Sequence, residues 1–459
     1  MKFLFFLGHD GFIRNFEPML AGLAHRGHAV QLALTGRRET LMSESASIED
    51  LCARYPSVAW TVAPKPRGRR SRALEGLSRS RNYLRYLETG YSGAAKLRER
   101  AAGYAPRPFR FAAPLLARSR LARQWMDAAL AWAVRRLGTD SAVDSFVRAQ
   151  KADAVLFTPL VGFGFGQHAP LRSAKRLGIP TAMLVHSWDN LTNKGLIHEL
   201  PERVVVWNEA QKAEAETLHR VPAGRIVVTG AQAWDEWFER RPSTTREEFC
   251  RKVGIDPVHP FVLYVGSSGF IAPDEALFVE QWLRALRSAD DPALREVGVV
   301  LRAHPQNEVS WSRVQLAEGG RAAIWPPLGA PRSGPDARAG YFDSIFHCGA
   351  VVGINTSALI ESAIVGRPVL TLLDPQFHDT QEGTLHFHHL TGDGDAAGML
   401  AVARTPAEHH AQLAAALNNG AESAGRGSAF VARFVRPHGL DEPATPHVVR
   451  AVETLAERA

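Results

Sequence analysis

Residues that bind phosphate or transfer protons occur in five short groups, each directly after an apolar run. Such runs are typical of strands in parallel sheets, and ligands of open α/β sheets bind beyond the carboxyl ends of the strands. The groups are His9-Asp10, His186-Ser187-Trp188-Asp189-Asn190, Gly266-Ser267-Ser268-Gly269, Arg302-Ala303-His304 and Asn355-Thr356-Ser357. Any one group is consistent with a cap or a turn, so their shared placement is what indicates a ligand site.

The group Asn355-Thr356-Ser357 stands between an apolar run and a helical pattern. Unpaired amides and the dipole at a helix N-terminus favour a phosphate, and the hydroxyls add donors. Plain N-capping by the same residue types is the alternative. Glu361 follows one turn further on the same helix face, where its carboxylate would accept hydrogen bonds from ribose hydroxyls or remain in solvent.

Two more groups in the second half of the chain suit an anionic ligand. In Gly266-Ser267-Ser268-Gly269, glycine allows backbone amides to approach a phosphate closely, although turns use the same residues. Arg302 and His304 would supply a cation and a hydrogen-bond donor at the end of the next strand. We therefore expect all three groups to contact an activated donor.

His9 and Asp10, in the first half, are the pair best suited to proton transfer. An imidazole of near-neutral pKa can take a proton from an attacking hydroxyl, and a carboxylate can orient the imidazole. Gly8 and Gly11 permit the turn that this pair needs. His9 is the expected catalytic base, with Asp10 as its orienting group or as the base itself. A structural cap is the alternative for His9.

The group at residues 186–190 is expected to line an acceptor pocket. His186 and Asp189 offer polar atoms, and Trp188 offers a ring face on which a sugar could stack. A position in the hydrophobic core is the alternative for Trp188.

We predict no metal site and no cofactor. One histidine-rich cluster has no usual zinc spacing, and a loop over the donor site is the better explanation for it. Its members are His378, Asp379, His386, His388 and His389. The three cysteines stand far apart and match neither a metal site nor a disulfide framework, which favours a reducing, cytoplasmic location. They are Cys52, Cys250 and Cys348.

Apolar runs alternate with helical patterns along the chain, which predicts parallel sheets in two α/β halves. In the first half the expected strands are Lys2–Leu7, His28–Leu34, Val58–Ala63, Ala154–Thr158, Thr181–His186, Arg203–Trp207 and Arg225–Thr229. In the second half they are Phe261–Val265, Val297–Arg302, Ala350–Ile354 and Pro368–Leu373. Three prolines within residues 240–260 predict an interdomain linker. The expected domains are therefore 1–240, for the acceptor, and 241–459, for the nucleotide donor, with C-terminal helices that could pack back on the first domain.

The charge of the chain is unevenly distributed. Its 459 residues carry a net charge of +7, and between Lys65 and Arg123 sixteen Lys and Arg stand against three acids. A solvated helical face explains this segment, and so does a surface that approaches anionic lipid or a polyanionic acceptor. No zinc-finger, RNP or aromatic-platform pattern supports binding of nucleic acid. The apolar run Phe3–Leu7 is too short for a signal peptide. We expect a cytoplasmic protein that could associate peripherally with the inner face of the membrane.

Several stretches resemble the GT-B glycosyltransferases, and the resemblance covers nearly the whole chain at the level of architecture. They are Gly8-His9 before a helix that ends in Arg26-Gly27-His28, Thr229-Gly230 with Asp235, His304-Pro305, and Val352–Ser357 with Glu361 and Gly366-Arg367-Pro368-Val369. The pairing of His304-Pro305 with Thr356-Ser357 is similar to bacterial capsule enzymes that use CMP- or CDP-activated donors. The resemblance implies two Rossmann-like domains facing a cleft, with donor phosphates and ribose held at the helix start and by the acidic residue.

The expected function is metal-independent glycosyl transfer from a nucleotide-activated donor to an acceptor hydroxyl of a glycan, lipid or small molecule, in synthesis of a surface polysaccharide or glycolipid. Arg302 and His304 would stabilise the charge of the leaving group. Asp10-Gly11 only partly matches the acidic pair and glycine of sialyltransferases, so sialic acid is not favoured over other sugars. The alternatives are a sugar-nucleotide 2-epimerase of the same fold, which needs carboxylates around the sugar ring, and a non-catalytic protein that binds an anionic polymer.

Overall fold

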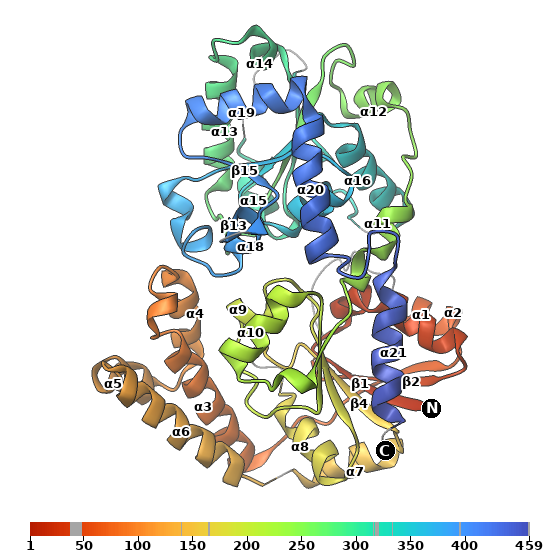
Figure 1. The fold of residues 1–459 in the computed structure, drawn as a ribbon, viewed down its shortest axis with the longest axis vertical. Coiled ribbons are helices and arrows are strands. Elements are labelled where there is room, and N and C mark those ends of the chain that lie inside the picture. The colour runs from red at the N-terminus through yellow and green to blue at the C-terminus, as the bar shows by residue number, and fades with distance from the viewer. Residues whose placement is uncertain are drawn as a thin grey trace. The chain divides into compact units, whose positions relative to one another are not determined.

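The computed structural model describes residues 1–36, 48–138, 140–163, 166–314, 316, 321–332, 334–393 and 396–457. The chain divides into two compact units. Unit 1 comprises Met1–Asp235 and Phe434–Ala459, and unit 2 comprises Glu236–Arg433. The C-terminal segment therefore returns to the unit in which the chain began (Figure 1).

Unit 1 is built on a parallel sheet of seven strands in the order β3-β2-β1-β4-β5-β6-β7. The strands are β1 (Lys2–Leu7), β2 (Ala29–Leu34), β3 (Val58–Val62), β4 (Ala154–Thr158), β5 (Thr181–Leu184), β6 (Arg203–Val206) and β7 (Ile226–Val228). The helices are α1 (Glu17–His25), α2 (Ile48–Arg54), α3 (Gly68–Arg85), α4 (Ala95–Tyr104), α5 (Arg107–Leu116), α6 (Arg120–Arg136), α7 (Ser141–Gln150), α8 (His168–Arg176), α9 (Asn190–Asn193), α10 (Glu209–His219) and α21 (Ala444–Ala456).

The continuous apolar run of β1 reflects a strand that is buried on both faces. Successive side chains of a strand point to opposite faces of its sheet. Phe3, Phe5 and Leu7 therefore pack in one core cluster with α1, α2 and α21. Leu4 and Phe6 pack in the other, with α7, α8 and α10.

Helices α3 to α6 form an excursion between β3 and β4, drawn in orange in Figure 1. Three prolines lie in or beside α5. Pro106 is its N-cap residue, Pro108 lies in its first turn, and Pro114 lies inside it.

Unit 2 is built on a parallel sheet of six strands in the order β10-β9-β8-β11-β12-β15. The strands are β8 (Phe261–Val265), β9 (Gly298–Arg302), β10 (Ala322–Ile324), β11 (Ala350–Gly353), β12 (Val369–Leu372) and β15 (Leu400–Ala403), and a small antiparallel pair is formed by β13 (Gly392–Asp393) and β14 (Ala396–Ala397). The helices are α11 (Asp235–Glu239), α12 (Arg246–Val253), α13 (Glu275–Arg287), α14 (Pro292–Glu296), α15 (Glu308–Trp311), α16 (Pro335–His347), α17 (Ser357–Ile364), α18 (Phe387–Thr391), α19 (Pro406–Asn418) and α20 (Gly420–Phe434).

The segment expected to be a linker, residues 240–260, is instead part of unit 2. It contains α12, whose N-terminus has a capping box formed by Thr245 and Glu248. Phe249 of this helix stacks on Phe261 at the start of β8, with 5.7 Å between the ring centroids. The prolines that suggested a linker flank this short, well-capped helix.

Both sheets have the doubly wound order in which the chain reverses direction beside the first strand. The reversal lies between β1 and β4 in unit 1, and between β8 and β11 in unit 2. The predicted α/β class with two parallel sheets is confirmed. In this class, ligands bind in the crevice at the carboxyl ends of the two strands beside the reversal.

Candidate functional site

The carboxyl ends of β8, β9 and β11 bring the predicted donor-binding groups of unit 2 together. These strands are neighbours in the sheet, and Val265 at the end of β8 is in register with Gly353 on one side and Arg302 on the other. The loops after β8 and β11 are joined directly, because the amide of Asn355 donates to Ser267 Oγ at 3.3 Å. The site thus lies at the reversal of strand order in unit 2.

Three side chains from β9, α16 and α17 form a connected group, which we call the Arg302 cluster: Arg302, Tyr341 and Glu361. The guanidinium carbon of Arg302 lies 4.1 Å from the ring centroid of Tyr341, and the hydroxyl of Tyr341 donates to Glu361. Trp237 packs edge-on against Tyr341 at 5.5 Å between centroids. An arginine held over an aromatic face is oriented in advance for a phosphate. Tyr341 was not predicted from the sequence, because a single aromatic residue in a helical pattern does not indicate a ligand site.

His304 is oriented by its own loop. Its Nδ1 accepts a hydrogen bond from the amide of Gln306 at 3.1 Å, at the start of the short 3₁₀ helix Pro305–Asn307. An accepting Nδ1 leaves the proton of the neutral ring on Nε2. The side chain is therefore suited to donate one hydrogen bond from Nε2.

Thr356 and Ser357 stand at the start of α17, as expected. Thr356 occupies the N-cap position with extended backbone, and its side chain makes no capping hydrogen bond. Its hydroxyl is therefore not used by the helix end. Glu361, a member of the Arg302 cluster, lies one turn further along the same helix.

Asn355, by contrast, serves the packing of unit 2. Its side chain is 3% exposed. The side-chain amide donates to the carbonyl of Thr380 and lies 3.3 Å from His386 Nε2. The Asn355 side chain was predicted to contact the nucleotide donor, but it bonds to Thr380 and His386 within unit 2 instead.

In the loop Gly266–Gly269, a carboxyl group of the chain itself bonds to the amide of Ser267. The amide of Ser267 donates to both oxygens of Glu275, at 2.9 and 2.8 Å, and Tyr264 Oη donates to the same carboxyl at 3.2 Å. Burial raises the pKa of Glu275 to about 8. The amide of Ser267 thus bonds to an internal carboxyl group in place of the expected phosphate, and Ser267 itself is completely buried.

Gly266 is required for packing of the loops. A Cβ at this position would lie 2.9 Å from the amide nitrogen of His304 and 3.0 Å from the carbonyl of Arg302. The carbonyl of Ser268 accepts from the amides of Ile271 and Ala272, at 2.9 and 3.0 Å. Gly266 therefore sets how closely the loops after β8 and β9 approach, and Ser268 forms the turn that leads into α13.

In unit 1, His9 lies at the reversal of strand order, between the ends of β1 and β4. Its ring stacks on Phe12 with 4.0 Å between centroids, and Phe12 contacts the ring of His186 at 4.4 Å. Asp10 Oδ1 accepts a hydrogen bond from the amide of Gly11 at 3.0 Å, which shapes the loop. The structure therefore places His9 and His186 in contact with the same aromatic ring.

His186 has both ring nitrogens engaged by neighbouring side chains. Thr158 Oγ1 donates to the carbonyl of Leu184 at 2.9 Å, so at 3.3 Å it can only accept from His186 Nδ1. Asn190 Nδ2 then donates to His186 Nε2 at 3.4 Å. Burial lowers the pKa of His186 to about 3. This histidine is neutral, with its proton on Nδ1.

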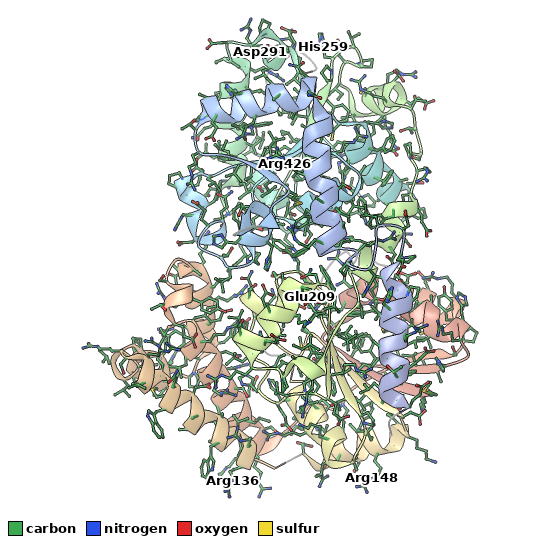
Figure 2. The ribbon with its side chains drawn as sticks, in the orientation of Figure 1. Arg136, Arg148, Glu209, His259, Asp291 and Arg426 are labelled. Carbon is green, nitrogen blue, oxygen red and sulfur yellow. The ribbon has the colours of Figure 1, made fainter. Side chains whose placement is uncertain are left out.

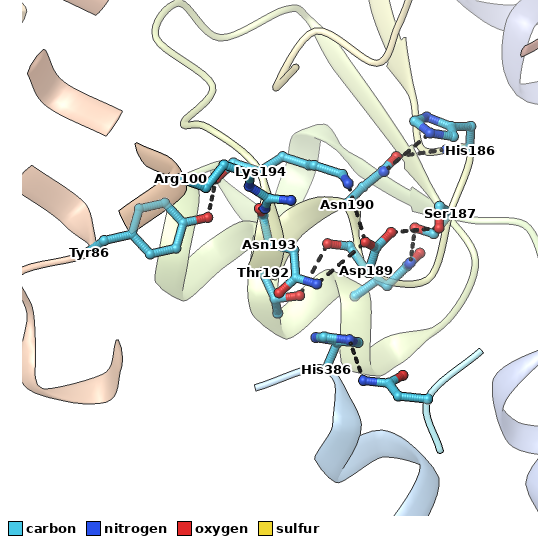
Figure 3. Close-up of polar contacts among 12 residues, drawn as sticks. Tyr86, Arg100, His186, Ser187, Asp189, Asn190, Thr192, Asn193, Lys194 and His386 are labelled. Carbon is cyan, nitrogen blue, oxygen red and sulfur yellow. Dashed lines mark hydrogen bonds and ion pairs between the residues drawn. The ribbon is translucent and has the colours of Figure 1, made fainter. Parts of the chain in front are cut away.

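The segment around α9, predicted to line an acceptor pocket, is a hydrogen-bonded turn (Figure 3). Asp189 accepts from Ser187 Oγ at 2.6 Å and lies 3.4 Å from Lys194 Nζ. Trp188 is 4% exposed, so it presents no open ring face on which a sugar could stack. The alternative of a core position is the correct one for Trp188.

The excursion supplies basic side chains that hold this turn in place. Arg85 Nη1 donates to the carbonyls of Lys194 and Gly195 at 3.2 and 3.1 Å, and Arg100 donates to the carbonyl of Asn193. Tyr86 Oη donates to the carbonyl of Lys194 at 2.8 Å (Figure 3). Part of the basic segment is therefore structural.

Among the residues that the structure describes, no group of three or more His, Cys, Asp or Glu side chains could hold a metal ion. In the histidine-rich segment, the short 3₁₀ helix Pro375–Thr380 precedes α18. His386 is 2% exposed and contacts Asn355, whereas His378 is exposed and lies 3.9 Å from Glu382. These histidines are thus spread over separate surroundings.

No protein-family model matches the chain. No curated protein matches it either. Solved structures of similar fold cover nearly the whole chain. The UDP-GlcNAc 2-epimerase from Methanocaldococcus jannaschii is 12% identical, covers 99% of this chain and 100% of its own, and has a TM-score of 0.53. The Anabaena Alr3699/HepE complex with UDP and glucose has 11% identity, the same coverage and a TM-score of 0.53. A glycosyltransferase from Rickettsia africae ESF-5 has 9% identity, covers 100% of this chain and 99% of its own, and has a TM-score of 0.54.

These likenesses define the class of fold. The two parallel sheets with their doubly wound strand orders are those of the GT-B fold, which the resemblance in sequence implied. At these identities the likeness establishes the fold alone.

Proposed function

We propose that the protein is a glycosyltransferase that moves a sugar from a nucleotide-activated donor to an acceptor hydroxyl. The observation that carries this proposal is the Arg302 cluster beside the start of α17, at the reversal of strand order in unit 2. A cation, a helix N-terminus and a carboxylate at one place match the phosphates and ribose of a nucleotide. In this proposal unit 2 binds the donor and unit 1 binds the acceptor.

The donor phosphates lie on Arg302, His304 Nε2 and the hydroxyls of Thr356 and Ser357, and Glu361 accepts from the ribose. As the bond between the sugar carbon and the phosphate oxygen breaks, negative charge grows on the phosphate. Arg302 and His304 are each held by contacts within unit 2, so they would stabilise this charge with little reorganisation. Ser267 and Asn355 act only by holding the loops.

On the acceptor side, His9 removes the proton from the attacking hydroxyl, with Asp10 as the second candidate for this role. Both lie in the loop after β1, beyond the carboxyl end of the first strand. The neutral His186 positions Phe12, on which His9 stacks. The acceptor class in this proposal is a surface polysaccharide or glycolipid, which the resemblance to bacterial capsule enzymes implies.

UDP is the first nucleotide to test. The Anabaena structure is described as a complex with UDP and glucose, and a UDP-GlcNAc 2-epimerase from Neisseria meningitidis as bound to UDP-GlcNAc. CMP and CDP donors, favoured by the resemblance to capsule enzymes, are the next candidates.

A sugar-nucleotide 2-epimerase is the second candidate function. It is supported by epimerases with TM-scores of 0.53 and 0.52 that cover 99% of this chain. Incubation with a UDP-sugar separates the two activities. Transfer gives a glycoside only when an acceptor is present, whereas epimerisation changes the donor sugar without one.

The nucleotide site is tested by calorimetric titration of the full chain with UDP, CDP, CMP, GDP and dTDP. One nucleotide should bind, and Arg302→Ala should weaken its binding by at least about tenfold, because a charge-assisted contact is lost. Arg338→Ala is the matched control, since Arg338 is an exposed arginine on α16. Equal affinity of Arg302→Ala and the control, both folded, would exclude the Arg302 cluster as the nucleotide site.

A further inference from the structure

Helices α5 and α6 expose an unusual concentration of large apolar side chains. In the described part of the chain, fourteen large apolar residues are exposed, and six of them lie on these two helices or in the turn that joins them. They are Phe111 (67%), Leu115 (62%), Leu116 (63%), Leu121 (68%), Trp125 (76%) and Trp132 (56%). The others are scattered over different elements, as single exposed apolar residues normally are. A concentrated patch of this kind marks an interaction surface.

The apolar residues of α6 form a stripe along one helix face. Leu121, Trp125, Ala128 and Trp132 are all exposed and follow one another at intervals of four, three and four residues. That spacing keeps side chains on one side of a helix. On α5, Phe111 and Leu115 have the same four-residue spacing. The opposite face of α6 is buried, through Ala131 and Val134.

Arginines border this apolar face. Residues 107–136 contain seven arginines and one acid, Asp127. Asp127 is already paired with Arg81, at 2.8 and 3.2 Å, so it does not offset the surface charge. Exposed arginines stand at both ends of the stripe: Arg118 and Arg120 before it, Arg135 and Arg136 after it (Figure 2 labels Arg136).

Two of these arginines lie over exposed rings. The guanidinium carbon of Arg136 is 5.0 Å from the ring centroid of Trp132, and that of Arg110 is 5.1 Å from Phe111. Tryptophan beside arginine is typical of the boundary between lipid headgroups and acyl chains, where the ring has an apolar body and a polar edge. No helix in the described ranges is long and apolar enough to cross a bilayer.

We propose that the α5–α6 face docks on an anionic lipid surface, with Trp125, Trp132 and Leu121 in the interface and the arginines on the headgroups. Charge complementarity favours an anionic lipid surface as the partner. Lipid headgroup phosphates would neutralise the arginines that border the apolar face, and the one acid among them, Asp127, is already paired. Because α6 continues to Arg136, the proposed face overlaps only in part with the segment Lys65–Arg123. Several arginines there, including Arg81, Arg85 and Arg100, bond within the protein instead. Docking does not depend on the proposed glycosyl transfer.

The test is flotation of the full chain with phosphatidylcholine vesicles, with and without phosphatidylglycerol, at low and high salt. We expect binding to the anionic vesicles, a marked loss with salt, and weak binding to neutral vesicles. Trp125→Glu with Trp132→Glu should reduce partition at least about tenfold, since two apolar anchors become anions. Arg135→Ala with Arg136→Ala should reduce it about tenfold or more at low salt.

Matched controls are Leu277→Glu with Val309→Glu for the apolar pair, and Arg148→Ala with Arg251→Ala for the charges. All four control positions are exposed and lie on other helices. The controls should bind vesicles as the parent chain does. Equal loss in the controls, equal binding to neutral vesicles, or no binding to either vesicle would overturn the proposal. A lipid-free dimer in sedimentation that the tryptophan variant abolishes would assign the face to a second copy instead.

Discussion

At the scale of single residues, the two histidines beside Phe12 differ in what they can do. His186 is held neutral, since Thr158 and Asn190 occupy its two ring nitrogens and burial lowers its pKa to about 3. It would not accept a proton at physiological pH. His9, which stacks on the same ring, lies in the loop after the first strand. If unit 1 supplies a histidine base, His9 is therefore the residue to test.

We expect His9→Ala to lower turnover by about a hundredfold or more, because a positioned general base typically contributes that much. Donor affinity should stay near that of the parent chain, since the donor is assigned to unit 2. Turnover and nucleotide affinity measured on the same preparations check both parts. His25→Ala, an exposed histidine on α1, is the matched control and should retain activity.

Asp10→Asn separates the two roles proposed for the carboxylate. A modest loss would fit an orienting group, because the amide oxygen can still accept from the amide of Gly11. Full activity of His9→Ala together with loss in Asp10→Asn would transfer the role of base to Asp10. Full activity in both would remove this loop from the mechanism.

The double change Thr356→Ala and Ser357→Ala tests the start of α17. Thr356 does not cap its own helix through its side chain, so removing its hydroxyl should cost the helix little. Donor binding should weaken by roughly 1–3 kcal/mol, the usual cost of losing hydrogen bonds to a charged group. Calorimetry gives the affinity, and an unfolding midpoint near that of the parent chain serves as the control. An unchanged affinity would place the phosphates elsewhere.

Residue types in the sequence showed where polar atoms gather, but not which of them are already bonded. Ser267 and Asn355 were indistinguishable from Thr356 in the sequence, yet the first two bond within unit 2. The partner of Ser267 is Glu275, eight residues away on α13. No sequence pattern indicates that the side chain of Glu275 points into the protein. Tyr341 was missed for the same reason, because its role depends on contacts between three elements.

At the scale of elements, Asp235 fixes the C-terminal helix to unit 1. Its carboxylate accepts from the amides of Ala444 and Thr445, at 2.9 and 2.8 Å, and lies 3.2 Å from Arg436. Six hydrophobic residues of α21, among them Val448 and Val452, pack in the same core cluster as β1. One buried acid thus positions the start of a helix more than two hundred residues away in sequence.

Asp235→Ala should destabilise unit 1 by about 3 kcal/mol or more, because it leaves the buried Arg436 without its counter-ion and the first amides of α21 without an acceptor. Urea unfolding followed by circular dichroism measures this. The neighbouring Glu236→Ala is the matched control, since Glu236 is exposed and pairs with Arg240 on the surface. Its effect should stay below about 0.5 kcal/mol. Similar losses in both variants would refute this role for Asp235.

Elements with strong apolar runs could be predicted from the sequence to within a residue or two, as with β1, β4 and β8. The missed strands β10 and β15 have the sequences AAI and LAVA, in which alanine gives little β-propensity. These strands form because neighbouring strands β9 and β12 pair with them. Such tertiary pairing lies outside any local pattern.

At the scale of the whole molecule, titratable groups buried in both units link folding to pH. Burial lowers the pKa of His168 and His409 to about 4 and that of His219 to about 3, and it holds the pKa of His198 well below its usual value. With His186, five histidines must stay neutral in the folded state. Burial has the opposite effect on Glu275, whose pKa rises to about 8.

The two kinds of group predict a maximum of stability near pH 7, because the five histidines outweigh the single glutamate at lower pH. A histidine with a lowered folded pKa takes up its proton only on unfolding, so its stabilisation is present above pH 6.5 and is lost as the pH falls toward the folded pKa. Each such histidine contributes a slope of about 1.4 kcal/mol per pH unit well below pH 6.5. Glu275 acts in the opposite direction, because the folded state holds its proton between pH 4.5 and 8. Its contribution to the free energy of unfolding therefore grows as the pH falls from 8.

Below pH 6 the five histidines outweigh the single glutamate, so the free energy of unfolding should fall by at least about 3 kcal/mol between pH 6.5 and 5. Urea unfolding at a series of pH values measures this slope. His219→Asn should reduce the proton uptake on unfolding by about one, because an amide replaces a titrating ring that bonds Ile197 and Leu191. His378→Asn, at an exposed position on a 3₁₀ helix, should leave the slope unchanged. A stability that stays constant from pH 7 to pH 5 would show that these histidines reach water in the folded protein.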